Sequence, residues 1–389
     1  MQQPVTALYI HFPFCRVRCA YCDFNTYAGL DHLVPRYVGA LIGEAGHLTH
    51  HFVGPLETVY LGGGTPSGVP ARHIGAVLAA CGDAFGLHAD VEISVEANPG
   101  SLTRRWLDSV RAYGVNRLSL GVQSLIDAEL TLLGRLHRRA DVTVAVADAR
   151  AAGFDNLSLD LIFGLPGQSL NAWRVTLEGA LELAPEHLSL YALTLEDGTP
   201  LADRVHRREL PAPDPDLAAD MYELASDVLD AFGFRQYEIS NWCRPGYECA
   251  HNRVYWRYQP YLGLGGGAHS FDGARRWWNV RSINDYLERL DAPSASDWPS
   301  PAAEGGEILN RVTQMGEMLM LGLRLTQEGV SEAEFRRRFG LALDEAFGSA
   351  VPDLIKAGLV DRDGERLRLT PRGRLLGNRV FARFLPEAA

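Results

Sequence analysis

Three of the six cysteines in this 389-residue chain lie close together, at Cys15, Cys19 and Cys22. Cysteine thiolates are the usual protein ligands of iron–sulfur clusters, and most clusters use four of them. Three thiolates on one loop hold three irons of a [4Fe–4S] cube and leave the fourth iron open to an exchangeable chelator. The amino and carboxylate groups of S-adenosylmethionine suit that position. The spacing C-x3-C-x2-C therefore predicts a cluster that works with S-adenosylmethionine.

Two other interpretations of the cysteines remain open. A zinc ion takes four ligands in a tetrahedral arrangement, and nearby His11 is a candidate for the fourth. The second interpretation is that the three residues are unrelated free thiols. The spacing, followed by Asp23 and Phe24, favours a cluster over zinc. In a reducing compartment, closely spaced cysteines indicate a metal or catalysis rather than disulfides.

The composition is that of an ordinary globular protein, with 47% hydrophobic and 22% charged residues. A net charge of −11 disfavours a general nucleic-acid binder, whose affinity comes from clustered Lys and Arg. No apolar run approaches 18 residues, and the start of the sequence lacks the pattern of a signal peptide. We therefore expect a cytoplasmic protein without a membrane span and without a nucleic-acid partner.

Short β-rich runs alternate with helical patterns over the first half of the chain. The helical segments include residues 70–85 and 169–183. Strand alternating with helix predicts right-handed crossovers and a parallel sheet. The fold class expected is α/β, an open (β/α)6 partial TIM barrel. The six predicted strands are residues 7–12, 58–64, 90–99, 117–123, 156–166 and 187–194.

Chemically unusual residues follow these strands, where the loops of such a barrel gather. The cysteine loop follows the first strand, and the run LGGGTP at 61–66 closes the second. Consecutive glycines let backbone N–H groups approach a ligand, although a tight turn explains them equally well. Glu96, Gln123 and Asp160 end later strands. Each alone is more often a capping or ion-pair residue, but together on one rim they indicate a ligand site.

The chain divides into three predicted units. The barrel occupies 1–208, an aromatic and glycine-rich extension occupies 209–291, and a linker at 292–307 leads to a C-terminal unit at 308–389. In the last unit, two helices and a two-stranded wing predict a winged-helix-like domain. Acidic and basic residues nearly balance there, which favours a docking or lid role over DNA binding. The methionines of 315–323 have helical spacing, which favours core packing.

The motifs LGGGTP, SVEANP, LSLGVQS, LGRLH, DLIFGLPGQ and SLYALT follow the cysteine loop in this order. In this respect the chain resembles, over essentially its whole length, the radical S-adenosylmethionine proteins of the oxygen-independent coproporphyrinogen III oxidase class. The resemblance implies that Cys15, Cys19 and Cys22 bind the cluster. It also implies S-adenosylmethionine contacts from Tyr9, Tyr21, Gly63, Gly64, Thr65, Glu96, Gln123, Arg135 and Asp160.

Two features favour the heme-chaperone branch of that class. The oxidases are expected to carry a further cysteine where this chain has Phe24, and a longer segment before the first strand. The stretch from His251 to Trp256 also has the H-N-x-x-Y-W pattern of the chaperone branch. A porphyrin needs an aromatic wall and an axial donor, and imidazole is a common heme ligand. His251 is the candidate ligand, and a histidine satisfied within an aromatic core is the plain alternative.

The candidates for that wall are Tyr255, Trp256, Tyr258 and Tyr261, with Cys249 and His269 as lesser heme ligands. The expected function is a heme chaperone with a [4Fe–4S] cluster and exchangeable S-adenosylmethionine, which transfers heme to unknown acceptor proteins. No catalytic residue is assigned. The alternative is a catalytic radical enzyme acting on a porphyrin, which would need an electron donor. A C-terminal unit that docks acceptors or that donor is a third hypothesis.

Overall fold

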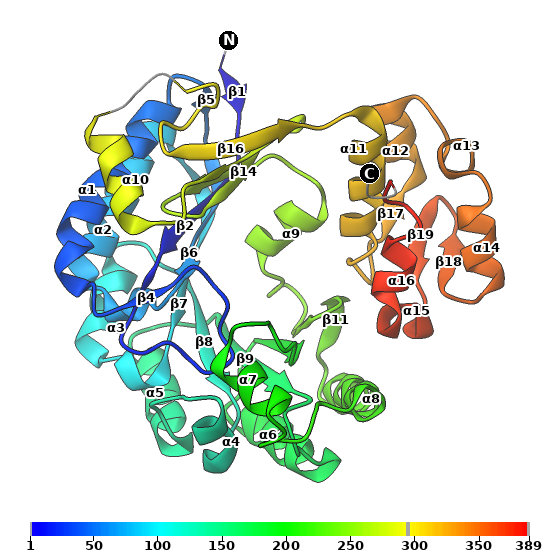
Figure 1. The fold of residues 1–389 in the computed structure, drawn as a ribbon, viewed down its shortest axis with the longest axis horizontal. Coiled ribbons are helices and arrows are strands. Elements are labelled where there is room, and N and C mark those ends of the chain that lie inside the picture. Colours follow the sequence, from blue (N-terminus) through cyan, green and yellow to red (C-terminus); the bar gives the residue numbers. More distant parts are fainter. Residues whose placement is uncertain (1, 293–295, 387–389) are drawn as a thin grey trace.

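The computed structural model describes residues 2–292 and 296–386. A curved nine-stranded sheet forms the main body, and its two edge strands do not pair with each other (Figure 1). The central strands are parallel and adjacent in chain order, which confirms the open (β/α)6 barrel. They are β2 (Ala7–Phe12), β6 (Leu56–Gly63), β7 (Leu87–Ala97), β8 (Arg117–Gln123), β9 (Leu157–Phe163) and β10 (His187–Ala192).

Helices cover the outer side of this sheet (Figure 1). They are α1 (Val34–Leu48), α2 (Ala71–Phe85), α3 (Arg104–Ala112), α4 (Asp127–Leu132), α5 (Arg139–Ala151) and α6 (Leu170–Glu182). The short helix α7 (Pro200–His206) instead lies beside the cysteine loop, where Leu201 N donates to Ala20 O. Among the described residues, no helix is both long enough and apolar enough to cross a bilayer.

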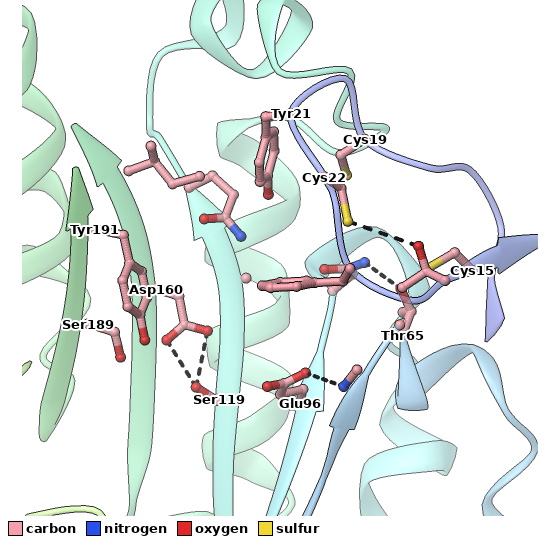
Figure 2. A pocket seen from close by; sticks show the side chains of 18 of the residues that line it. Cys15, Cys19, Tyr21, Cys22, Thr65, Glu96, Ser119, Asp160, Ser189 and Tyr191 are labelled. Carbon is pink, nitrogen blue, oxygen red and sulfur yellow. Dashed lines mark hydrogen bonds between the residues drawn. The ribbon is translucent and has the colours of Figure 1, made fainter. Parts of the chain in front are cut away.

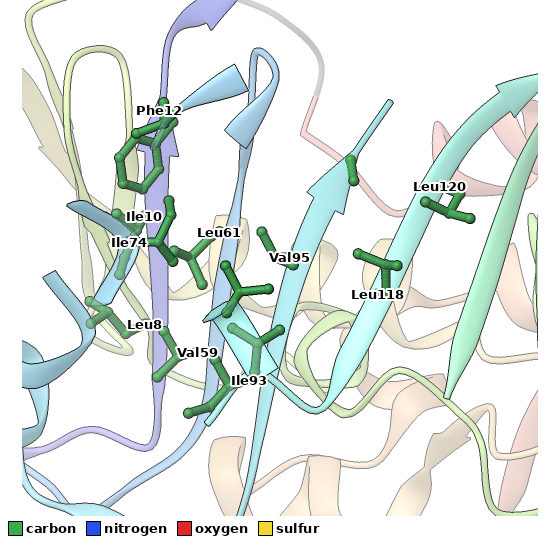
Figure 3. Packing of buried hydrophobic residues seen from close by; sticks show 14 of the residues in the cluster. Leu8, Ile10, Phe12, Val59, Leu61, Ile74, Ile93, Val95, Leu118 and Leu120 are labelled. Carbon is green, nitrogen blue, oxygen red and sulfur yellow. The ribbon is translucent and has the colours of Figure 1, made fainter. Parts of the chain in front are cut away.

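The main core lies between the strands and these helices (Figure 3). In β2, Leu8, Ile10 and Phe12 are fully buried and pack toward Ile74 of α2. Successive side chains of a strand point to opposite faces. Tyr9 and His11 therefore point toward the inside of the barrel.

The sheet continues beyond the proline-rich segment at 209–216. After α8 (Pro215–Ala231), strands β11 (Arg235–Glu238) and β12 (Asn241–Cys243) add an antiparallel pair beside β10. Strand β13 (Leu262–Leu264) pairs parallel with β2 at the opposite edge. Between them, α9 (Ala250–Trp256) packs against β6.

A simple linker was expected at 292–307. Residues 293–295 lie outside the described part of the chain, and the expectation was wrong for the second half of the segment. Strand β16 (Ala303–Ile308) pairs with β15 (Arg275–Asn279), which pairs with β14 (His269–Phe271). The glycines there have a packing role: a Cβ on Gly306 would lie 2.6 Å from the Trp298 ring. Helix α10 (Ile283–Asp291) precedes this segment.

The C-terminal part has its own apolar core and the predicted helix, helix and wing. Met315 and Met318 are buried in that core, as expected. The wing has a third strand that the sequence did not indicate. The elements are α11 (Arg311–Gly322), β17 (Val330–Ser331), α12 (Glu332–Phe339), α13 (Leu343–Phe347), α14 (Ala350–Lys356), β18 (Val360–Asp363), β19 (Arg366–Leu369), α15 (Pro371–Leu375) and α16 (Gly377–Phe381). The division into three units at 208, 291 and 308 stays a prediction.

Candidate functional site

The cysteine loop is anchored at both ends and in the middle. Short strands β3 (Phe14–Cys15) and β4 (Tyr27–Ala28) pair at its ends. Ala20 N donates to Leu133 O at 3.0 Å, and Leu201 N donates to Ala20 O at 2.9 Å. Asn25 Nδ2 donates to Gly266 O at 2.9 Å. Three segments that are distant in the sequence therefore hold this loop in place.

The sulfur atoms of Cys15, Cys19 and Cys22 are free and line one cavity (Figure 2). Arg135 Nη1 donates to Cys19 Sγ at 3.3 Å, and Thr65 Oγ1 lies 3.5 Å from Cys15 Sγ. Burial raises the pKa of the Cys15 thiol. Among the described residues, no three Cys, His, Asp or Glu side chains converge closely enough for a single metal ion. This spread does not match the tetrahedral zinc alternative.

The cavity has a volume of about 370 Å³ and lies at the carboxyl ends of the parallel strands, inside the barrel. Every predicted S-adenosylmethionine contact lines it except Tyr9. These residues are Tyr21, Gly63, Gly64, Thr65, Glu96, Gln123, Arg135 and Asp160. The structure thus brings together residues from successive strands that the sequence placed on one rim.

The glycine run at the end of β6 is required because there is no room for side chains at these positions. Gly63 has φ +109°, and a Cβ there would lie 2.4 Å from the His11 ring. A Cβ on Gly64 would lie 2.7 Å from Phe14 O. A side chain at either position would collide with the β2 segment. The run therefore lets the backbone pass between β2 and the cavity.

Two buried carboxyl groups face the cavity. Glu96 accepts hydrogen bonds from Tyr60 Oη at 2.9 Å and from Gly63 N at 3.0 Å. Burial, together with the nearby Asp160 carboxyl, raises the pKa of Glu96 to about 7. Ser119 Oγ lies 3.0 and 3.1 Å from the two carboxyl oxygens of Asp160, whose pKa is also raised by burial. Both groups can accept hydrogen bonds from an amine or from hydroxyls of a ligand.

The end of β8 has an unusual backbone. Gln123 has φ +69°, a conformation that residues other than glycine rarely adopt, and the pairing with β9 is irregular between Gly121 and Gln123. Arg135 Nη2 donates to Gly121 O and to Asn98 Oδ1, both at 2.5 Å. The bulge turns the Gln123 side chain into the cavity and leaves a carbonyl for Arg135.

Tyr9 lies behind the cavity. Its hydroxyl is 2.9 Å from His11 Nδ1, and His11 Nε2 is 2.9 Å from Asn25 O. Burial lowers the pKa of His11. Both ring nitrogens of His11 are engaged, which further disfavours it as a zinc ligand. The predicted contact between Tyr9 and S-adenosylmethionine stays a prediction.

His251 does not line the cavity. It is buried in α9, with Nδ1 2.9 Å from Thr58 Oγ1 and Nε2 2.8 Å from Tyr255 Oη. Its ring stacks on Tyr60 at 5.3 Å between centroids. Burial, with a smaller effect of Arg117, lowers its pKa to about 3. This conformation matches the plain alternative of a satisfied core histidine. Heme ligation by His251 stays a prediction, and it requires the hydrogen bond of the coordinating ring nitrogen to break.

Most side chains of the expected aromatic wall also pack against other residues of the protein. Tyr255 packs edge-on against Tyr261 at 4.5 Å, and Arg324 lies 4.4 Å from the centre of the Trp256 ring. Arg253 of α9 and Arg257, which directly follows the helix, both bind Glu328, close to the C-terminal core. Helix α9 thus joins the barrel to the C-terminal part. Cys249 is fully buried, and burial raises its pKa to about 12; heme ligation by its thiol stays a prediction.

Several cavity residues were not predicted. They are Tyr60, Asn98, Arg117, Ser119, Ser189, Tyr191 and Asn252. The two-residue alternation of a strand would have found some of them, since Arg117 and Ser119 precede Gly121 on the same face of β8. Arg117 is only 2% exposed, and within the described part of the chain it has no ion pair.

The fold and the three-cysteine cavity define a radical S-adenosylmethionine protein with an added C-terminal domain. Residues 9–180 match the family model of the Radical SAM superfamily, and residues 309–376 match the HemN C-terminal domain. Coproporphyrinogen III oxidase (HemN) from Escherichia coli has a similar solved structure. The TM-score is 0.84 at 25% identity, over 98% of this chain and 90% of that one.

Two curated relatives match nearly the whole chain. Heme chaperone HemW of Mycobacterium tuberculosis is 42% identical over 382 residues, which cover 97% of this chain and 94% of the relative. The mouse mitochondrial Radical S-adenosyl methionine domain-containing protein 1 is 39% identical, over 98% of this chain and 87% of the relative. The chain belongs to the HemW family of radical S-adenosylmethionine proteins. This confirms the predicted family and its chaperone branch.

Proposed function

We propose that the protein is a heme chaperone that carries a [4Fe–4S] cluster and S-adenosylmethionine, binds heme and passes it to acceptor proteins. The observation that carries the proposal is the cavity that joins three free thiols to the polar strand ends of the barrel. The heme part rests on the near full-length similarity to curated proteins named heme chaperones.

The residues at the cavity mouth fit a cluster with one open iron. Three thiols are available on one anchored loop, and Phe24 stands where a fourth cysteine would follow. No other cysteine lines the cavity in the described part of the chain. In this proposal Cys15, Cys19 and Cys22 bind the cluster, which supplies an electron and an open coordination site when bound.

The inner part of the cavity fits S-adenosylmethionine. Glu96 and Asp160 are placed to accept hydrogen bonds from an amine and from ribose hydroxyls. Gly63 and Gly64 offer backbone at close range, while Tyr21, Thr65 and Gln123 line the same space. Arg135 is already bonded to Cys19, Asn98 and Gly121. Its role in this proposal is to position the cysteine loop against β8 beside the ligand.

The test is a titration of anaerobically reconstituted protein with heme. We expect about four irons and four sulfides per chain before heme is added, and a Soret band that saturates near one heme per chain. Cys22→Ser should lose the cluster, whereas Cys81→Ala should keep it, because Cys81 is buried in α2 away from the cavity. Zinc in place of iron, or no saturable Soret band, would contradict the proposal.

A second candidate is a radical enzyme that acts on a porphyrin. It is favoured by the complete set of buried polar groups in the cavity, which a heme carrier has little need of. The likeness to coproporphyrinogen III oxidase extends over 98% of the chain. Product analysis after anaerobic reduction separates the two functions. Deoxyadenosine formed in proportion to a modified tetrapyrrole would support the enzyme, and slow cleavage independent of added tetrapyrrole would argue against it.

A further inference from the structure

Three large apolar side chains are exposed at the rim of the cavity. Val17 is 49% exposed, and Phe24 and Leu136 are each 64% exposed. Val17 and Phe24 line the mouth of the main cavity, and Val17 and Leu136 line a smaller hollow next to it. Val17 therefore links the other two into one apolar border. Contiguous exposed apolar surface beside a cavity is typical of a binding site.

The border belongs to an anchored loop. Phe24 O accepts hydrogen bonds from Thr26 N at 2.8 Å and from Arg18 Nη2 at 3.3 Å. Ala20, between the exposed positions, is bonded on both sides through Leu133 and Leu201. The backbone beneath Val17 and Phe24 is thus fixed, and their exposure is a built feature of the loop. A surface ordered in advance loses little entropy when a ligand binds.

Two cations flank the border. Arg16 and Arg18, on either side of Val17, are both exposed. Neither forms an ion pair in the described part of the chain. Asp23 is the acidic neighbour on the same loop. An exposed apolar border beside two guanidinium groups that form no ion pair among the described residues complements a planar apolar ring that carries two carboxylates.

We infer that this rim is the heme-docking surface, with one face of the porphyrin on Val17, Phe24 and Leu136 and its propionates near Arg16 and Arg18. The inference rests on the proposed function and adds where heme binds. The other locations are less suitable. A cavity of about 370 Å³ is near the lower limit for one ligand and does not hold S-adenosylmethionine and heme together. The ring nitrogens of His251 are both engaged.

A heme on this rim would cover the mouth of the cavity. Bound S-adenosylmethionine should then leave more slowly when heme is present, because its exit is blocked. A heme that replaced the packing of His251 on Tyr60 would leave the mouth of the cavity open and should not slow this release. The release rate of radiolabelled S-adenosylmethionine with and without heme therefore reports on the location of heme.

The direct test compares heme affinity in cluster-loaded variants. Val17→Ser combined with Phe24→Ser should weaken heme binding by about tenfold or more, because apolar contact area is lost. The matched control combines Val144→Ser with Phe232→Ser, at positions 60% and 56% exposed that do not line the cavity. The control should bind heme like the unmodified protein. Iron and sulfide content checks that the loop still holds its cluster.

The proposed contact of the heme propionates with Arg16 and Arg18 is tested separately, with substitutions that leave the apolar border unchanged. Arg16→Gln combined with Arg18→Gln should weaken binding of heme but leave binding of heme dimethyl ester unchanged, since the ester has no carboxylates. Arg372→Gln with Arg379→Gln, exposed in the C-terminal part, is the control.

Unchanged heme affinity in both rim variants would overturn the inference while leaving the chaperone proposal intact. Absence of heme binding by the unmodified protein would instead overturn the chaperone proposal.

Discussion

The guanidinium of Arg135 donates a hydrogen bond to Cys19 Sγ at 3.3 Å and a second to Gly121 O of β8 at 2.5 Å. One side chain therefore connects the cysteine loop to the strand that carries Gln123. Its charge lies at the sulfur that the proposal assigns to the cluster. Hydrogen bonds to cluster sulfurs are one of the factors that set reduction potential.

Arg135→Gln should lower the reduction potential of the reconstituted cluster. The loss of a cationic donor destabilises the reduced, more negative state relative to the oxidised one. The expected shift is on the order of tens of millivolts. An anaerobic redox titration followed by electron paramagnetic resonance measures it. Arg135→Lys, which keeps a positive charge, should shift the potential less, and equal potentials in all three proteins would refute this role.

Glu96 should make the apoprotein less stable as the pH rises toward neutrality. Its pKa is raised from the ordinary 4.5 to about 7. Between these values the folded chain keeps a proton that the unfolded chain has lost. The free energy of unfolding therefore falls from about pH 4.5 to about pH 7 and levels off above, by roughly 3 kcal/mol at most.

Glu96→Gln should remove this part of the pH dependence, because the amide cannot ionise. Urea unfolding between pH 4.5 and 7.5 gives the comparison. Glu238→Gln is the control, since burial raises the pKa of Glu238 to only about 6 and the residue does not line the cavity. The fall in the free energy of unfolding that Glu238 causes should end near pH 6, below the end of the fall that Glu96 causes. Parallel stability curves for the Glu96 variant and the unmodified protein would show that the raised pKa is not real.

Gly63→Ala should disrupt the cavity, while Gly68→Ala should not. A Cβ on Gly63 meets the His11 ring at 2.4 Å and the residue has a positive φ, whereas a Cβ on Gly68 has no neighbour within 4 Å. We expect Gly63→Ala to lose about 2 kcal/mol of stability or more, together with S-adenosylmethionine affinity. Denaturant unfolding and equilibrium dialysis measure the two effects. Equal behaviour of the two variants would exclude the steric explanation.

His251→Ala should reduce stability and leave the Soret band in place. The change removes the hydrogen bonds with Thr58 and Tyr255 and the stacking on Tyr60, at a cost of about 3 kcal/mol. Unfolding in urea and the heme spectrum are measured on the same preparation. A variant of normal stability that loses or shifts its Soret band would instead identify His251 as the axial ligand and favour a rearranged α9.

The parallel strands and most of the cavity could be predicted from the sequence. The run at 117–123 has the same bounds in the structure as in the prediction, and Glu96, Gln123 and Asp160 meet in one cavity as expected. This succeeded because the carboxyl ends of parallel strands meet on one rim whatever their side chains are. Strand β13, with three residues, and β16, rich in glycine, were missed because their pairing depends on partners elsewhere in the chain.

The sequence by itself determined the three-cysteine loop, the order of strands and helices, and the polar residues that follow the strands. These follow from local spacing and from the alternation of side chains along a strand. Only the tertiary structure decided that His251 is buried against Tyr60, that Arg135 reaches Cys19, and that Val17, Phe24 and Leu136 form one exposed border. The physical reason is that burial and hydrogen bonding here join segments more than one hundred residues apart, as between Asn25 and Gly266, and local sequence pattern carries no record of such contacts.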